Sequence, residues 1–253
     1  MSAPTPSVGV SKAPDRIAGM FDAIARRYDR LNHLLSAGLD RRWRRRAIRD
    51  LALTGTERVL DVCTGTGDLA IEAATSPSGH ARDVLGIDFS SEMLRLAQGK
   101  VRAAALSSRI RIVRGDATRL PVPDESADVA TVAFGIRNVV DPVQGCRELH
   151  RVLVPGGRLA ILEFGAPRIP GVRTVYLWYF KYLLPLVGRA ISKHSDAYTY
   201  LPESVMSFPA GEAFAGLLRQ AGFETVQSQP LTFGIVWLYL ARKPEKIRRV
   251  SFT

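Results

Sequence analysis

The pattern of apolar and polar residues predicts an α/β protein with a parallel sheet. Short apolar runs alternate with segments in which apolar residues recur every three or four positions, and these predict strands and helices. Because a helix follows most strands, we expect a doubly wound sheet covered on both faces. The predicted strands lie near residues 58–62, 84–87, 110–113, 128–133 and 158–163, and the helices near 67–75, 90–105, 142–151 and 211–221.

The C-terminal part of the chain predicts two further strands. Apolar runs at 223–227 and 231–240 flank Gln229-Pro230, which we expect to connect them as a hairpin at the sheet edge. The sheet would then be seven-stranded and mostly parallel. Ligands of such sheets bind outside the carboxyl ends of the strands, so we expect the chemistry at that edge.

The remaining segments predict coverings and tails around one domain, residues 16–245. Helical spacing begins at Arg16, and a second helix should run from about Asp40 to Leu51. The expected parts are a disordered tail (1–15), a helical cap over the cleft (16–53), a cofactor-binding core (54–165), a substrate lid (166–210), a C-terminal helix and hairpin (211–245) and a basic tail (246–253).

The expected lid is unusually apolar and aromatic. It contains the run Tyr176 to Val187, interrupted by Lys181 and Pro185. Two interpretations stay open. The segment either packs on the sheet as part of the core, or it is a lid that lines a cleft for an apolar substrate or touches a membrane, where aromatic and basic side chains are favoured.

A glycine turn predicts a site for a nucleoside-containing cofactor. The stretch from Val59 to Glu72, VLDVCTGTGDLAIE, predicts a strand, a turn and a helix. Gly65 and Gly67 allow close approach to the backbone, and the carboxylate of Asp88, after the next apolar run, can accept both hydroxyls of a ribose. The same spacing also fits the relaxed dinucleotide fingerprint of NAD and FAD enzymes, so the glycines alone do not identify the cofactor.

Acidic residues at three successive strand ends favour S-adenosylmethionine over NAD. Asp61, Asp88 and Asp116 each end or follow a predicted strand. A carboxylate attracts a sulfonium or ammonium group but repels a pyrophosphate, and Asp116 could accept from an adenine amino group. The alternative is that these residues only cap the helices that follow, which is less expected for all three together.

Composition and charge limit the other functions. The chain has 253 residues and a net charge of +11, with an arginine cluster from Arg41 to Arg46. Such a cluster attracts nucleic acid or anionic lipid, or is a solvated helix face. The two cysteines and four histidines lack metal-ligand spacing, so we expect no metal and a cytoplasmic protein. No apolar run reaches the ~20 residues that cross a bilayer, so any membrane contact would be peripheral.

Several segments resemble one family, the UbiE/COQ5/MenG methyltransferases. The similar blocks are YDRLNHLLS from Tyr28 with Trp43, GTGD from Gly65 with Asp88, FGIRN from Phe134, RVLVPGGRL from Arg151 with Glu163-Phe164, and YTYLPES from Tyr198 with Phe208-Pro209. The departures are Leu31 in place of methionine, Asp40 in place of histidine, Cys63-Thr64 in place of a smaller pair, Ala133 in place of serine, and Gly165 in place of the serine in Glu-x-Ser.

The resemblance implies a class I methyltransferase fold and S-adenosylmethionine as the cofactor. It also implies a polyprenylated quinol as substrate, either demethylmenaquinol or the 2-polyprenyl-6-methoxy-1,4-benzoquinol of ubiquinone synthesis. Other phenolic acceptors remain alternatives, and so does a homodimer. The implied cofactor-binding residues are Asp61, Gly65, Thr66, Gly67, Asp88, Asp116, Ala117 and Ala133.

The implied catalytic residues are Arg137, Asn138 and Tyr28. Carbon methylation of a quinol needs the phenolate, because the ring carbon of the neutral quinol is a poor nucleophile. Arg137 would hold the phenolate electrostatically, while Asn138 and Tyr28 orient the ring hydroxyls. The alternative for Arg137 is a salt bridge to a carboxylate. A basic nucleic-acid-binding module is the non-enzymatic alternative, and we expect no nucleic acid because no reading module is recognisable.

Overall fold

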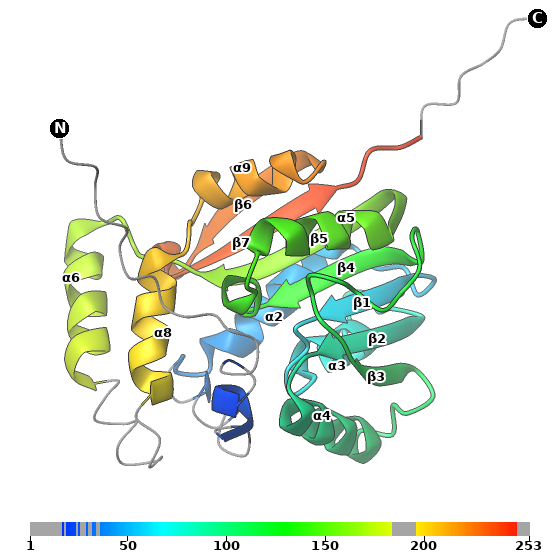
Figure 1. Cartoon of the computed structure of the whole chain (residues 1–253), viewed down its shortest axis with the longest axis horizontal. Helices are drawn as coiled ribbons and strands as arrows, with labels where there is room; N and C mark the ends of the chain where they lie inside the picture. Colours follow the sequence, from blue (N-terminus) through cyan, green and yellow to red (C-terminus); the bar gives the residue numbers. More distant parts are fainter. Residues whose placement is uncertain are drawn as a thin grey trace, which may run out of the picture.

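The computed structural model describes residues 17, 19–23, 25, 29, 32–33, 36–183 and 196–246. Its centre is a seven-stranded sheet in the order β3-β2-β1-β4-β5-β7-β6 (Figure 1). The strands are β1 (Arg58–Val62), β2 (Asp83–Asp88), β3 (Ile110–Arg114), β4 (Ala127–Ala133), β5 (Leu153–Phe164), β6 (Glu224–Leu231) and β7 (Val236–Arg242). The first five are parallel, and β7 is antiparallel to both β5 and β6. The predicted mostly parallel sheet is confirmed.

The hairpin at the sheet edge turns at a different place from the one predicted. Gln229 and Pro230 lie inside β6, where they pair with Leu238 and Trp237. The connection is instead a 3-10 turn, η3 (Thr232–Gly234). The prediction that Gln229-Pro230 joins the strands is therefore wrong. Proline lacks an N–H donor, but β6 is the outermost strand of the sheet, and a proline is tolerated on such a strand.

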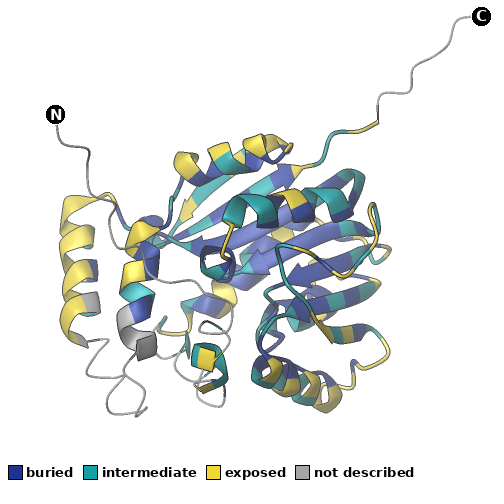
Figure 2. Cartoon of the chain, viewed as in Figure 1, coloured by how far each residue is buried: buried dark blue, intermediate teal, exposed yellow. Residues whose placement is uncertain are grey.

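Helices cover both faces of the sheet. They are α2 (Leu39–Leu51), α3 (Asp68–Thr75), α4 (Ser91–Ala103), α5 (Pro142–Val152), α6 (Pro170–Trp178), α8 (Asp196–Ser207) and α9 (Glu212–Gln220), with the short helices η1 (Ile136–Asn138) and η2 (Tyr179–Leu183). Leu149 of α5 and Phe214 of α9 belong to one apolar cluster, and Trp43 of α2 and Leu69 of α3 to the other. The inner strands are buried between these two layers (Figure 2).

The expected lid lies beside the carboxyl ends of the strands. Its described part consists of α6, η2 and α8, which stand next to the sheet end to which β4 and β5 point (Figure 1). Tyr176 and Tyr200 are buried, whereas Val175 and Trp178 are exposed. The segment therefore packs inward and also presents an apolar outer face. Among the helices that the structure describes, none combines the length and apolarity needed to span a bilayer.

The ends of β1 and β4 meet in strained backbone. Cys63 and Phe134, the residues that follow these strands, have φ angles of 55° and 59°. This left-handed conformation is uncommon outside glycine and tends to occur at functional sites. A Cβ atom on Gly135 would lie 2.3 Å from the Cβ of Cys63. Only glycine fits at position 135 while Cys63 keeps its place.

We expect Gly135→Ala to destabilise the fold by more than about 2 kcal/mol, because the new methyl overlaps Cys63. Urea unfolding gives the value. The double variant Cys63→Gly/Gly135→Ala removes the overlapping atom and should recover most of the loss. Gly99→Ala is the matched control, because a Cβ there meets nothing within 4 Å and alanine is favoured in a helix. Equal stability of Gly135→Ala and Gly99→Ala would contradict this explanation.

Candidate active site

A cleft opens at the carboxyl edge of the sheet, where β1 to β4 end. Its empty volume is about 840 Å³, including its open mouth. Six predicted site residues line it: Gly65, Asp88, Asp116, Ala117, Ala133 and Asn138. Four others do not line it and are buried beside it: Asp61, Thr66, Gly67 and Arg137. The eleventh, Tyr28, lies outside the described residues.

Asp88 is held in place by backbone N–H groups that follow β1 and β2. Its Oδ2 accepts from the N–H of Gly65 at 2.8 Å, and its Oδ1 accepts from the N–H of Ser90 at 2.9 Å. Burial raises the pKa of Asp88, and these two hydrogen bonds oppose the rise. Each carboxylate oxygen retains acceptor capacity toward the cleft. The arrangement can hold two neighbouring hydroxyl groups of a ligand.

Asp116 extends the same wall at the end of β3. Its Oδ1 accepts from the N–H of Thr118 at 2.8 Å, and its side chain is half-buried. A Cβ atom on the preceding Gly115 would lie 2.8 Å from Pro121 and 2.9 Å from Ile87. The backbone is therefore packed closely behind Asp116, which keeps the carboxylate at the rim of the cleft.

Asp61, Thr66 and Gly67 shape the turn rather than the cleft surface. The carboxylate of Asp61 is 1% exposed and accepts from the hydroxyls of Thr64 and Thr131 at 2.6 and 2.7 Å. Gly67 has φ 82° where α3 begins, a conformation that glycine adopts without strain. Asp61 therefore ties the end of β1 to β4 and fixes the turn that presents Gly65.

The electrostatic environment of the cleft is negative. Cys63 lines the cleft, and burial raises the pKa of its thiol well above the ordinary value. Four neighbouring carboxylates raise it further, in the order Asp88, Asp61, Glu163 and Asp116. The neighbouring carboxylates, which disfavour a thiolate here, also disfavour a bound diphosphate and favour a cation.

Arg137 is paired with Glu163 next to the cleft. Both side chains are buried, and Nη1 of Arg137 donates to Oε1 of Glu163 at 2.7 Å. The same nitrogen donates to the carbonyl of Phe134, and the guanidinium lies 5.4 Å from the ring centroid of Phe164. The salt bridge that was the alternative for Arg137 is thus present. It joins the ends of β4 and β5.

The positive field of Arg137 extends to the lid. Burial raises the pKa of the Tyr176 phenol, and the charge of Arg137 opposes this rise. Glu163 acts in the raising direction, with a smaller influence. At this hydroxyl Arg137 thus favours the ionised form, whereas burial, Tyr179 and Glu163 disfavour it.

Asn138 connects the cleft to the lid through a residue that sequence reasoning did not select. The hydroxyl of Tyr200 in α8 donates to Oδ1 of Asn138 at 3.0 Å. Tyr200 stands in the block YTYLPES, so the family resemblance was the available signal. Other lining residues that were missed are Cys63, Phe89, Ser90, Met93, Val139 and Val140. Their apolar or small side chains carry no distinctive pattern.

The N-terminal segment contributes to the cleft wall. Ile17 and Phe21 line it, as expected for a segment that covers its mouth. Asp22 accepts hydrogen bonds from the Ser90 hydroxyl and from the N–H of Glu92 at 3.1 Å. These contacts attach the segment to the first turn of α4, directly beside Asp88.

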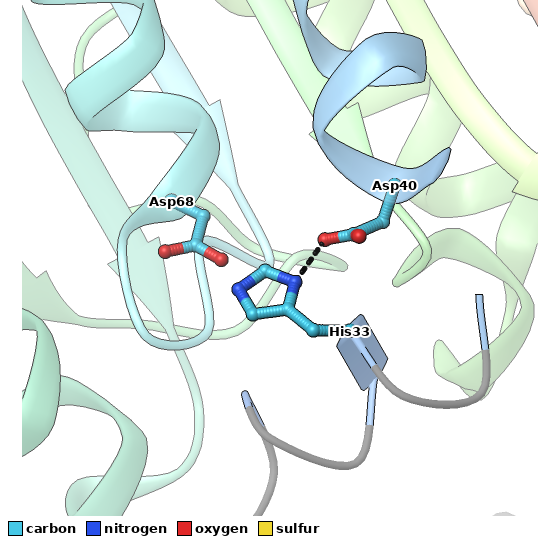
Figure 3. A group of neighbouring side chains, drawn as sticks. All are labelled: His33, Asp40 and Asp68. Carbon is cyan, nitrogen blue, oxygen red and sulfur yellow. Dashed lines mark ion pairs between the residues drawn. The ribbon is translucent and has the colours of Figure 1, made fainter. Parts of the chain in front are cut away.

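Ion pairs attach the same segment to the glycine turn. Asp29 accepts from the Thr66 hydroxyl at 2.6 Å and from Lys100 at 2.9 Å. His33 lies between Asp40 and Asp68, with its Nδ1 2.7 Å from Asp40 (Figure 3). Although one histidine and two carboxylates are typical metal ligands, Arg44 pairs with both carboxylates and Lys100 pairs with Asp68. These cations already balance the negative charge, so we interpret the cluster as an ion-pair network.

The arginine cluster is divided between the interior and the surface. Arg44 is buried in the network just described. Along the outer face of α2, four arginines line an open groove together with Glu72 and residues 75–78: Arg42, Arg45, Arg46 and Arg49. None of the groove residues lines the cleft. The surface arginines therefore form a separate basic face.

Asp61 makes stability depend on pH in a direction opposite to that of most carboxylates. Burial raises its pKa to about 6, above the ~3.9 of an unfolded aspartate. Between these values the folded protein keeps a proton that the unfolded chain releases, so this contribution to stability falls as pH rises through the window. In Asp61→Asn the contribution is absent. The free energy of unfolding of the variant, relative to that of the wild type, should therefore rise by up to about 3 kcal/mol from about pH 4 to about pH 7, as measured by urea unfolding. A pH-independent difference would contradict the buried carboxylate.

Structural relatives share the fold but perform different reactions. The crystal structure of the [4+2]-cyclase SpnF superposes with a TM-score of 0.68 at 19% identity, over 94% of this chain and 100% of that one. A SAM-dependent methyltransferase, a possible histamine N-methyltransferase, from Thermotoga maritima gives 0.61 at 19% identity, over 90% and 99%. At these identities the likeness establishes the class I methyltransferase fold alone.

Sequence relatives identify the family. The model of the ubiE/COQ5 methyltransferase family matches residues 10–243. The "Ubiquinone/menaquinone biosynthesis C-methyltransferase UbiE" of Geobacter sp. (strain M21) is 46% identical over 234 residues, 92% of this chain and 99% of the relative. The "Demethylmenaquinone methyltransferase" of Thermus thermophilus is 46% identical over 226 residues, 89% and 100%. The chain therefore belongs to the ubiE/COQ5 methyltransferase family and is an S-adenosylmethionine-dependent methyltransferase.

Proposed function

We propose that this enzyme transfers a methyl group from S-adenosylmethionine to a ring carbon of a polyprenylated quinol. The observation that carries the proposal is the negative cleft at the carboxyl edge of the sheet, next to the buried Arg137. A cleft that favours a cation suits the sulfonium, and an adjacent cation suits a phenolate acceptor. The names of the sequence relatives support a quinol rather than another phenol.

The lining residues fit the cofactor. Asp88 would hold the ribose hydroxyls, and Asp116 with Ala117 would hold the adenine. Gly65 has room for close approach, since a Cβ there would meet nothing within 4 Å. Ala133 would line the methionine part, while Asp61, Thr66 and Gly67 keep the turn in shape.

The acceptor is activated by charge and by exclusion of water. When bound, S-adenosylmethionine supplies an electrophilic methyl group. Arg137 stabilises the phenolate form of the quinol, with Asn138 and Tyr28 orienting the ring hydroxyls. The hydroxyl of a free phenol has a pKa of about 10, and the proton that it releases leaves through water. A dry cleft favours a reaction in which charge is neutralised on both partners, and the apolar lid keeps water out of the cleft.

The substrate is most simply demethylmenaquinol, the naphthoquinol precursor of menaquinol. The relatives from Deinococcus radiodurans and Thermus thermophilus are named as demethylmenaquinone methyltransferases, and others as ubiquinone/menaquinone enzymes. Because a polyprenyl chain resides in lipid, we also infer peripheral contact of the enzyme with an anionic membrane. The net charge of +11 supports this contact.

Incubation with labelled S-adenosylmethionine tests the function. The purified full-length chain is given demethylmenaquinol or the 2-polyprenyl-6-methoxy-1,4-benzoquinol under reducing conditions, and the product mass is measured. We expect the naphthoquinol to gain one methyl on carbon. Methylation of neither quinol, with the chain folded and the cofactor bound, would contradict the proposal.

Asp88→Ala should weaken S-adenosylmethionine binding by about 3 kcal/mol, roughly 100-fold in the dissociation constant, because hydrogen bonds to a charged acceptor are lost. Calorimetric titration gives the affinity. Because burial raises the pKa of Asp88, wild-type affinity should also begin to fall at a higher pH than an ordinary aspartate would cause. Asp83→Ala, at the opposite end of β2, is the matched control. Unchanged affinity in Asp88→Ala would refute the ribose assignment.

Arg137 can be tested separately from the salt bridge that it makes. Arg137→Ala leaves Glu163 as a buried unpaired charge, which should cost about 3–5 kcal/mol of stability. In Arg137→Met/Glu163→Gln no charge remains, so stability should largely return. Methyl transfer should nevertheless stay at least ~100-fold below the wild type, with cofactor affinity nearly intact.

If turnover returned together with stability in the double variant, Arg137 would have only a structural role. Turnover kinetics, urea unfolding and cofactor titration on the same preparations distinguish the two outcomes.

A further inference from the structure

The segment from Ile169 to Tyr182, which comprises α6 and most of η2, carries most of the exposed large apolar side chains of the described chain. Nine such side chains are exposed among the residues that the structure describes, and five of them fall between residues 169 and 182. They are Ile169, Val175, Leu177, Trp178 and Tyr182. This concentration needs a partner, because scattered apolar residues are normal on a surface but a contiguous patch marks an interaction site.

The exposed residues form two neighbouring rows along α6 and η2. Val175, Trp178 and Tyr182 follow the helical repeat and are 67%, 55% and 48% exposed. Arg173 and Lys181 stand in the neighbouring row, with Leu177 between them, and Nζ of Lys181 lies 5.1 Å from the Tyr182 ring centroid. An apolar row with tryptophan and tyrosine beside a basic row is typical of helices that lie in the interface of a membrane.

The charge of this segment matches an anionic lipid surface. From Phe164 to Ser195 the sequence contains no Asp or Glu, while it contains five Lys or Arg residues. A basic stretch of this kind is attracted to anionic headgroups by about 1 kcal/mol per cation. The charge therefore favours lipid as the occupant.

The opposite face of α6 points into the protein. Tyr176 is buried there, and its phenol senses the charges of Arg137 and Glu163. In Figure 2 the helix stands at one end of the molecule with its exposed side outward. One helix, about 10 Å across, thus separates the exposed apolar face from the buried side that carries Tyr176.

We propose that α6 and the adjoining η2 form an interfacial element that docks the enzyme on an anionic bilayer through Val175, Trp178 and Tyr182, so that a polyprenyl chain passes from the lipid beside α6 to the cleft. The purpose of this docking rests on the proposed quinol function, whereas the docking itself does not. Arg173 and Lys181 hold lipid phosphates, and the aromatic rings enter the headgroup region.

Co-sedimentation with vesicles tests the docking. The full-length chain should bind vesicles of phosphatidylglycerol and phosphatidylcholine more tightly than vesicles of phosphatidylcholine alone. Trp178→Ala should weaken binding to the anionic vesicles about tenfold. Arg173→Gln/Lys181→Gln should weaken it about 25-fold, fivefold for each cation. Arg82→Gln/Arg219→Gln removes two exposed cations from other elements and should change binding less than about twofold.

If Arg173→Gln/Lys181→Gln and Arg82→Gln/Arg219→Gln weakened vesicle binding equally, the net charge of the protein alone would explain the binding. That result would overturn the assignment to α6. The assignment also fails if the wild type does not bind vesicles, or if Trp178→Ala binds as tightly as the wild type. A dimer in light scattering that Trp178→Ala dissociates, without vesicle binding, would instead assign the face to a second copy of the chain.

An activity comparison separates this proposal from the proposed function. Trp178→Ala should lower kcat/KM about tenfold for a long-chain quinol held in anionic vesicles and leave it unchanged for a short-chain quinol in buffer. Methylation of neither quinol by the wild type would contradict the quinol function while the sedimentation result still decides the docking. An equal loss on both quinols would show that α6 acts on the site and not on access from lipid.

Discussion

The structure depends on keeping carboxylates in place at the carboxyl ends of parallel strands, where burial makes their charge costly. Asp88 is the clearest case, because backbone N–H groups of Gly65 and Ser90 hold both of its oxygens. Asp61 is held by two threonine hydroxyls and Glu163 by Arg137. The fold thus stabilises a concentration of negative charge that water would otherwise have to solvate. This charge suits a cationic cofactor, and the methyl-transfer mechanism follows from it.

The coverings of the cleft are attached by the same kind of interaction. The N-terminal segment is tied to the glycine turn through Asp29, Lys100 and Thr66, and to the neighbouring helix through Asp22 and Ser90. On the other side, Tyr200 ties α8 to Asn138. Hydrogen bonds and ion pairs therefore connect both coverings to residues at or beside the cleft. Displacing either covering would alter the site as well as its access to water.

Periodicity predicted the sheet and the helices well, because burial between two layers imposes apolar runs on the strands and a three-to-four repeat on the helices. Gly65 and Asp88 were predictable because local turn geometry links them to the strand ends. The turn after β6 was predicted at Gln229-Pro230, because proline usually ends a strand. Pro230 is tolerated inside β6 because β6 is the outermost strand of the sheet. Pairs such as Arg137 with Glu163 are 26 positions apart, and no local pattern encodes such a contact. For Arg137 the sequence left two roles open, and its salt bridge is visible only in three dimensions.

The most direct test of the central claim is a calorimetric titration of the full-length chain with S-adenosylmethionine and, separately, with NAD. Both molecules contain an adenosine that Asp88 could hold, but only one brings a sulfonium and only the other a pyrophosphate. A cleft that selects by charge should give saturable binding of S-adenosylmethionine and none of NAD at the same concentrations. Equal affinity for both, or preference for NAD, would show that the charge of the cleft does not select the ligand.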